Sequence, residues 1–275
     1  MMRTMQTARA VPTHPADLLT VIGIALVAYA ASNVLHEAVG HGGACLALGG
    51  TPLALSSVHF ECSHAGMSAL ASRGVSAAGT IVNFIAGALA FAALTRIPPR
   101  TRPHLTYALW LFGTLNVLMG AGYFLFSGIG DIGDWAAVAR GTLPPSIWRP
   151  TMAVFGAVLY WILARTSARA LRPLVGSDNL AMRRGRRLAV PAYFAGGLLY
   201  CISGLFNPVG PILIAISAAA ASFGGASGLL WLTSLLPHFR ADGEPIALSR
   251  SHGWIAAGAV SALVFVALLG PSLQF

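Results

Sequence analysis

Seven stretches of the chain are each long and apolar enough to cross a lipid bilayer as a helix, and they constrain the fold more than any other feature. They cover approximately residues 18–48, 74–95, 104–127, 149–168, 188–206, 210–236 and 253–272. A helix that spans the hydrocarbon core needs about 20 apolar residues, and irregular backbone facing lipid has no partner for its polar groups. The sequence therefore predicts an all-α polytopic membrane protein with about seven transmembrane helices, within a range of six to eight.

The composition agrees with a chain whose surface contacts lipid. Charged residues make up 9% of the chain and hydrophobic residues 56%, whereas soluble domains carry about 25% charged residues. All 17 basic residues are arginines, and they lie mostly between the apolar stretches. Arginines in such loops set the topology and contact lipid phosphates. We expect the lipid bilayer as a partner and no nucleic-acid binding.

The distribution of arginine predicts the orientation. Cytoplasmic loops carry an excess of basic residues. Arginines are frequent in segments 1–17, 96–103 and 165–187, and few in 49–73, 128–148 and 207–209. The pattern predicts a cytoplasmic N-terminal tail at residues 1–17 and a C-terminus outside. Arginine without lysine is typical of a GC-rich bacterial genome, so we expect a bacterial inner membrane.

One short element in the first apolar stretch contains residues of the types that bind metal ions and transfer protons. His36, Glu37 and His41 lie late in that stretch, and Glu37 is the only acidic residue inside any strongly apolar segment. An ionisable side chain at membrane depth costs roughly 2.5–3.5 kcal/mol on insertion scales, which indicates a functional site. In the motif H-E-x-x-H, two imidazoles hold a metal ion and the glutamate acts as base. Here the histidines are one residue further apart.

The extra residue makes the local winding decisive. At about 100° per residue, positions five apart on an α-helix are separated by about 140°, against about 40° for positions four apart. A one-residue π-bulge near Gly40 would bring His36 and His41 onto one face. In a regular helix, Glu37 and His41 would instead face a common site.

Two further elements follow in order on the next two apolar stretches. The first is Gly79-Thr80-Ile81-Val82-Asn83, and the second is Asn116 followed by a Gly-Asp segment that ends at Asp134. With the His-Glu element, these resemble the site-2-protease family of intramembrane zinc metalloproteases, across residues 18–140. That family carries H-E-x-x-H, then a Gly-Pro-x-x-Asn-like element, then an Asn…Asp-Gly element.

The resemblance implies a Zn²⁺ ion held by His36, His41 and Asp134, with Asp131 as the substitute third ligand. It also implies that Glu37, as general base, polarises a metal-activated water. That water would hydrolyse a peptide bond in or next to a membrane segment, so the expected partner is a membrane-spanning or membrane-adjacent peptide.

Three other residues belong to the matching elements. Gly79, Asn83 and Asn116 are expected to contact substrate or to bridge helices. Residues 18–140 would form the three-helix core with the metal motifs, and residues 141–275 would add transmembrane helices to the same domain.

Departures from the family pattern support an alternative. Besides the histidine spacing, Thr80 stands where the family has proline, and Asp134 precedes Trp135 rather than glycine. These departures favour a catalytically inactive member that acts as a structural or assembly subunit of a membrane complex, with or without a metal. Its partner subunits are not identified by the sequence.

The segment after the first stretch predicts a hairpin. Residues 51–73 contain alternating, β-rich patches, typical of a small irregular β-hairpin. His59 and Glu61 would face one way on a strand and Cys62 and His64 the other, which indicates a wet loop rather than a four-ligand site. Cys45 and Cys62 pair only if both face an oxidising compartment, and free cysteines are the favoured reading.

Aromatic residues near the ends of the apolar stretches are placed to lie at the membrane surface. Tyr123 and Trp135 are of this kind. Tyrosine and tryptophan are enriched at the membrane–water interface. We expect both as interface anchors.

Overall fold

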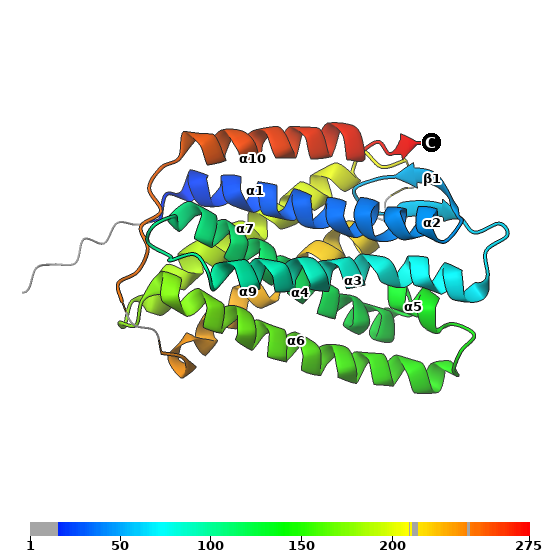
Figure 1. Cartoon of the computed structure of the whole chain (residues 1–275), viewed down its shortest axis with the longest axis horizontal. Coiled ribbons are helices and arrows are strands. Elements are labelled where there is room, and N and C mark those ends of the chain that lie inside the picture. The colour runs from blue at the N-terminus through cyan, green and yellow to red at the C-terminus, as the bar shows by residue number, and fades with distance from the viewer. Residues whose placement is uncertain (1–15, 209, 211–213, 241–242) are drawn as a thin grey trace, which may run out of the picture.

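The protein is an elongated bundle of helices with a small sheet at one end (Figure 1). The computed structural model describes residues 16–208, 210, 214–240 and 243–275, so nearly all of the predicted tail lies outside the described residues. The described helices are α1 (Leu18–Val34), η1 (Leu35–Gly42), α2 (Gly43–Ala47), α3 (Ala69–Leu94), α4 (Pro103–Gly130), α5 (Asp134–Ala139), α6 (Pro145–Val175), α7 (Ala181–Gly204), η2 (Ile214–Gly224), α9 (Gly228–Trp231), η3 (Leu232–His238), α10 (His252–Val264) and η4 (Phe265–Leu269).

Six helices in the described part of the chain are long and apolar enough to cross a membrane. They are Leu18–Ala47, Ala69–Leu94, Pro103–Gly130, Pro145–Val175, Ala218–His238 and His252–Leu269. This confirms the predicted class, a polytopic helical protein with six to eight spans. The predicted fifth span corresponds to α7, which begins with an arginine-rich turn and is not one of the six.

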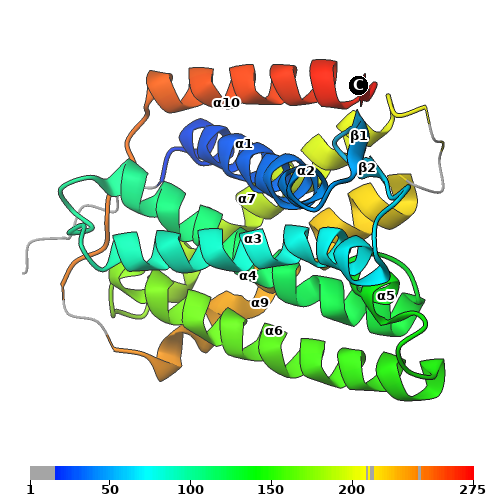
Figure 2. The ribbon, with the colours of Figure 1, turned by 45° about the vertical axis from the view of Figure 1, so that its right-hand side comes forward.

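The first span is capped at its start by Asp17 and ends just before Gly49. The Asp17 side chain accepts hydrogen bonds from the Thr20 backbone N–H at 2.9 Å and from its hydroxyl at 2.8 Å, which satisfies a donor that an α-helix leaves unpaired at its start. Gly49 has φ of +84° just after the last helical turn, a conformation that glycine adopts without steric cost. α1, η1 and α2 form one continuous rod between these residues, and α10 lies along α1 (Figure 2).

Buried polar tips are paired with backbone groups of neighbouring helices. The Tyr107 hydroxyl donates to the Leu188 carbonyl at 2.9 Å, and the Trp110 indole N–H donates to the Ser167 carbonyl at 2.9 Å. Helices in lipid associate through packing and such interhelical bonds, because lipid is as apolar as their side chains. These contacts tie α4 to α7 and α6.

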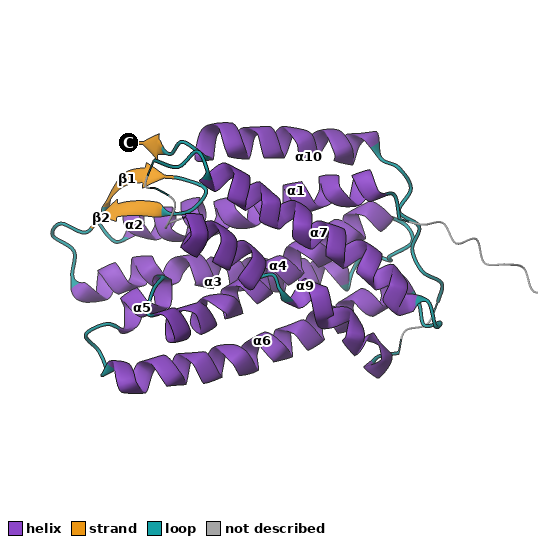
Figure 3. Cartoon of the chain, turned by 180° about the vertical axis from the view of Figure 1, so that it is seen from behind, coloured by secondary structure: helices purple, strands orange, loops and turns teal. Residues whose placement is uncertain are grey.

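The predicted hairpin is present in residues 51–73. β1 (Thr51–Leu55) and β2 (Phe60–Ser63) pair antiparallel, with a register shift between Pro52 and Ala54. A third strand from the end of the chain, β3 (Leu273–Gln274), pairs with the other edge of β1, so the order is β2-β1-β3. The C-terminus therefore lies beside the hairpin, at the end of the bundle opposite the start of α1 (Figures 1 and 3).

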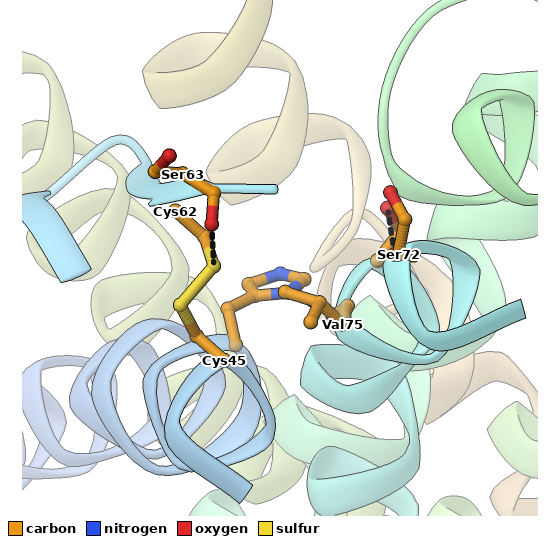
Figure 4. Close-up of a disulfide and its surroundings, with 7 residues drawn as sticks. Cys45, Cys62, Ser63, Ser72 and Val75 are labelled. Carbon is orange, nitrogen blue, oxygen red and sulfur yellow. Dashed lines mark hydrogen bonds between the residues drawn. A yellow bond between two sulfur atoms is a disulfide. The ribbon is translucent and has the colours of Figure 1, made fainter. Parts of the chain in front are cut away.

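The prediction of free cysteines at positions 45 and 62 is wrong. Cys45 in α2 and Cys62 in β2 form a disulfide, with Cα atoms 6.1 Å apart (Figure 4). The chain turns back immediately after α2, so residues 17 apart in sequence become neighbours. The disulfide fixes β2 to the end of the first span.

The turn between β1 and β2 is buried, whereas Glu61 and His64, in the segment expected as a wet loop, are exposed. Ser56, Ser57 and Val58 are at most 6% exposed. The Ser57 backbone N–H donates to the Leu269 carbonyl at 2.9 Å, and the Ser57 carbonyl accepts from the Asn33 amide at 3.0 Å. The turn between β1 and β2 is thus inserted into the bundle, next to the first span.

Candidate metal centre

The segment that carries the His-Glu element is wound as a π-helix. η1 extends over eight residues, Leu35–Gly42, rather than the single-residue bulge that the sequence suggested. Hydrogen bonds in a π-helix run from i to i+5, so side chains five apart lie above one another, and such segments are frequent at functional sites. His36 Nε2 and His41 Nε2 are consequently 3.2 Å apart. The regular-helix alternative, with Glu37 and His41 as the pair, does not occur.

Asp134, which follows the end of α4, completes the group. Its Oδ2 lies 3.2 Å from His36 Nε2 and 3.4 Å from His41 Nε2. Asp134 is the first residue of α5, and the preceding Gly133 has φ of +85°, a backbone conformation that favours glycine. The glycine that makes the turn therefore precedes the aspartate in this chain.

Asp131, the substitute third ligand, lies elsewhere. It caps the end of α4 with φ of 55°, and its carboxylate pairs with Arg140 at 3.2 Å. The structure brings Asp134, and not Asp131, beside the two histidines.

The donor separations suit a tetrahedral metal ion. Zinc binds imidazole nitrogen and carboxylate oxygen at about 2.0–2.2 Å, so ligand atoms in a tetrahedral site lie roughly 3.3–3.5 Å from one another. The three observed separations are 3.2, 3.2 and 3.4 Å. His36, His41 and Asp134 could therefore hold a metal ion, and a set of three protein ligands leaves a fourth position open.

The electrostatics of the group favour an ionised aspartate. Burial raises the pKa of the Asp134 carboxyl, but the two neighbouring imidazoles lower it by more. The net result is a pKa well below the usual range of an aspartate. The carboxylate is the form in which an aspartate binds metal.

The two histidines are held in different ways. His41 Nδ1 donates to the Val75 carbonyl at 2.7 Å, which fixes the tautomer whose Nε2 faces the site. The His36 ring stacks on Tyr123, with ring centres 4.5 Å apart and planes within 8°. The interpretation of Tyr123 as an interface anchor is therefore wrong, because its ring packs against His36.

Two glycines allow η1 and α3 to approach closely enough for the site to form. A Cβ on Gly40 would lie 2.5 Å from the Gly79 Cα, and a Cβ on Gly79 would lie 2.6 Å from both His36 Cε1 and His41 Nε2. Real Cβ atoms do not come this close to other atoms. Gly79 therefore supplies the space that the two imidazoles occupy.

Thr80 has a structural role that a proline could not fill. Its hydroxyl accepts a hydrogen bond from the Trp135 indole N–H at 3.1 Å, and the Trp135 ring stacks on Phe124 at 4.3 Å between centres. Trp135 is thus a link between α3 and α5 rather than an interface anchor. Because it is the neighbour of Asp134, this link holds the start of α5 against α3.

Glu37 lies beside a large cavity that also contains the three candidate ligands. The cavity has a volume of about 930 Å³ and is lined mostly by apolar side chains of α4, β2 and η2. His36, Glu37 and His41 are only 3%, 5% and 7% exposed. His59 and His64 of the hairpin also line this cavity, although they do not join the ligand group.

The two asparagines of the sequence motifs lie in different surroundings. Asn83 is 1% exposed and lines a second, smaller cavity with His36 and Glu37. The Asn116 amide donates to the Ser32 hydroxyl at 2.9 Å and so bridges α4 to α1. Of the three residues expected at the substrate or between helices, Gly79 and Asn83 lie beside the histidines and Asn116 does not.

Comparisons with protein-family models, with curated proteins and with solved structures gave no match. The structure itself is that of a multi-helix membrane protein with a buried His-His-Asp cluster. The resemblance to site-2 proteases stays a prediction that rests on the motif residues.

Proposed function

We propose that this protein is a membrane-embedded zinc metalloprotease. The observation that carries the proposal is the group of three ligand atoms, separated by 3.2–3.4 Å, with Glu37 in the same cavity. A His-His-Asp set with an open fourth position is the arrangement of a catalytic rather than a structural zinc site. The longer histidine spacing was one of the departures that favoured an inactive protein. Because η1 is π-wound, this spacing is compatible with two histidines that face one site.

His36, His41 and Asp134 would hold the ion, and Glu37 would move the proton. Zinc lowers the pKa of a water that it binds towards about 7, which supplies a nucleophile at neutral pH. Glu37 follows His36 on η1 and lines the same cavity as the three candidate ligands. Its carboxylate is therefore placed to accept a proton and return it to the leaving amine.

The cavity and the exposed edge of the sheet support a proposed substrate class. A helix must unwind before its carbonyl can be attacked, and an extended peptide can add to an exposed strand edge. β3 covers one edge of β1, whereas no described strand pairs with the outer edge of β2. We propose that a membrane-spanning or membrane-adjacent peptide binds along β2.

The orientation is proposed on two grounds. Disulfides persist in oxidising compartments and are rare in the cytosol, and Cys45–Cys62 lies at the end of the bundle that carries the sheet. The arginine-rich segments 96–103 and 165–187 lie at the opposite end; the first joins α3 to α4, and the second comprises the end of α6, the turn 176–180 and the start of α7. Both observations support our proposal that the metal centre lies near the outer face of a bacterial inner membrane, with the C-terminus outside.

A comparison of zinc content and cleavage tests the function. Purified protein should contain about one zinc ion per chain, and Glu37→Gln should retain the zinc because the change leaves all three ligands intact. The wild-type protein in liposomes should cleave co-reconstituted synthetic peptides of about 20 apolar residues, with products identified by mass spectrometry. Glu37→Gln should lower the rate by about 10²–10⁴-fold.

Three outcomes separate the alternatives. Cleavage that survives in Glu37→Gln would show that the proposed mechanism is wrong. Zinc without cleavage in the wild-type protein would favour the metal-stabilised structural subunit. Purified protein that binds no zinc would contradict the metal centre itself.

A further inference from the structure

A second, smaller cavity lies behind the metal centre. It has a volume of about 20 Å³, and its lining includes His36 and Glu37, the buried Ser32, whose hydroxyl accepts from Asn116, and three further buried polar residues, Asn33, Ser57 and Asn83. These three are 7%, 1% and 1% exposed, and they come from α1, the hairpin tip and α3. Three separate elements thus direct polar side chains to one enclosed point beside the His-Glu element.

Each of these side chains presents an atom that has no partner among the described residues. The atoms are Asn33 Oδ1, Ser57 Oγ, Asn83 Oδ1 and His36 Nδ1. Buried polar groups are almost always hydrogen-bonded, to protein or to ordered water. Four such groups around one small cavity indicate a shared partner.

The orientation of Asn33 is fixed by its other hydrogen bond. Its Nδ2 donates to the Ser57 carbonyl at 3.0 Å, and a carbonyl can only accept, so Oδ1 is the free acceptor. Ser57 is itself held by the hydrogen bond from its N–H to the Leu269 carbonyl. Asn33 and Ser57 are therefore each held by a hydrogen bond to the backbone of a neighbouring element.

We propose that this cavity binds one ordered water molecule that positions His36 in the metal centre. A cavity of about 20 Å³ exceeds the roughly 10–15 Å³ that one water needs, and a buried water typically makes 2–4 hydrogen bonds. The two donors and two acceptors around the cavity match the two acceptor and two donor positions of one water. The water accepts from the His36 Nδ1–H and the Ser57 hydroxyl, and donates to Asn33 Oδ1 and Asn83 Oδ1.

The water does for His36 what the Val75 carbonyl does for His41. A metal-binding histidine donates its other ring N–H to a carboxylate, a carbonyl or a water, which fixes the tautomer and the ring orientation. His41 Nδ1 has such a partner in the protein, whereas His36 Nδ1 has none among the described residues. Asn33, Ser57 and Asn83 are then positioning residues, because they act on the ion through His36. The inference rests on the proposed metal centre.

Nuclear magnetic resonance of the zinc-loaded full chain, labelled with ¹⁵N at histidine, tests the site. The His36 Nδ1–H should receive magnetisation from water, while the His41 Nδ1–H, bonded to the Val75 carbonyl, should not; this second signal is an internal control. Asn83→Leu should abolish the water contact of His36 and weaken zinc binding about 10–100-fold. Thr114→Val removes a buried hydroxyl of α4 that lines neither cavity and should leave the water contact unchanged.

Ser57→Ala provides a second variant with a smaller change, should Asn83→Leu fail to fold. It should reduce the water contact and weaken zinc binding a few-fold. A zinc-loaded protein whose His36 Nδ1–H receives no magnetisation from water would overturn the inference and leave the metal centre intact. The same conclusion follows if the contact persists unchanged in Asn83→Leu or in Ser57→Ala. A protein that binds no zinc at all would overturn the proposed function and the inference together.

Discussion

The two halves of the first span form one continuous helix, but they differ in winding and in the side chains that they bury. α1 is regularly wound and packs against α4, α7 and α10. η1 is π-wound, and its His36, Glu37 and His41 are all buried beside α3. In the winding of α1, residues five apart are separated by about 140°, whereas in η1 the two imidazole nitrogens are 3.2 Å apart. Local winding, rather than motif spacing, decides which side chains meet.

The largest expected effect comes from removing a candidate ligand in the π-wound half. His36→Ala or His41→Ala should abolish stoichiometric zinc binding, because two protein ligands remain of the three that a catalytic site uses. Thr20→Ala, a buried polar substitution in α1, is the matched control and should retain zinc. Metal analysis of purified variants measures both. Full zinc content in His36→Ala would show that the π-wound pair is not the ligand set.

The next prediction concerns the space that α3 leaves for η1. Gly79→Ala places a Cβ 2.6 Å from His36 Cε1 and His41 Nε2, so the rings must move, and we expect zinc affinity to fall about 10–100-fold, as for other displaced ligands. Gly74→Ala on the same helix meets only the flexible end of Leu48 at 3.0 Å. Competition titration with a zinc chelator should separate the two variants. Equal affinities would mean that the close approach at Gly79 is not needed.

The disulfide fixes β2 to the end of the same span, so its loss should loosen the hairpin. A cross-link that closes a loop of about 15 residues contributes about 3 kcal/mol to stability, and Cys45 and Cys62 are 17 apart. Cys62→Ser should therefore lower the thermal midpoint in detergent by several degrees. Cys201→Ser changes an unpaired cysteine and should leave the midpoint nearly unchanged. A similar midpoint for both variants would argue against the bridge.

The smallest predicted effect is at Thr80. Thr80→Val keeps the shape but removes the acceptor of the Trp135 N–H, at a cost of about 1 kcal/mol. Zinc affinity should fall by roughly fivefold because the start of α5 is less firmly held. Thr80→Ser keeps the hydroxyl and should restore it. If Val and Ser variants bind zinc equally well, the link to Trp135 does not position Asp134.

Much of the fold follows from hydropathy alone. Apolar stretches of spanning length form helices in a bilayer because their backbone groups must pair within the segment, and the alternating pattern at 51–73 is typical of strands. The convergence of His36, His41 and Asp134 also follows once adjacent spans are placed at the same depth, although the metal-binding role of these residues stays a prediction. The division of the chain near residue 140 stays a prediction as well.

Other features depend on contacts that one sequence does not reveal. The disulfide and β3 arise from residues brought together by turns and by the return of the C-terminus to β1. Tyr123 near the end of a span has the sequence signal of an interface anchor, and only the packing of α4 against η1 shows that its ring stacks on His36. In the sequence, Thr80 is noticeable only because the family pattern has proline at that position. Its hydrogen bond with Trp135 joins residues 55 apart in sequence, so the sequence does not reveal it.

X-ray absorption at the zinc edge tests the central claim most directly. The protein loaded with one zinc ion should show a four-coordinate site with two imidazole ligands and additional oxygen ligands at about 2.0–2.2 Å. Two imidazoles require that His36 and His41 share a face, which the π-winding of η1 provides. A site with a single imidazole would mean that the segment is regularly wound and presents Glu37 with His41. That result would contradict both the metal centre and the proteolytic function proposed from it.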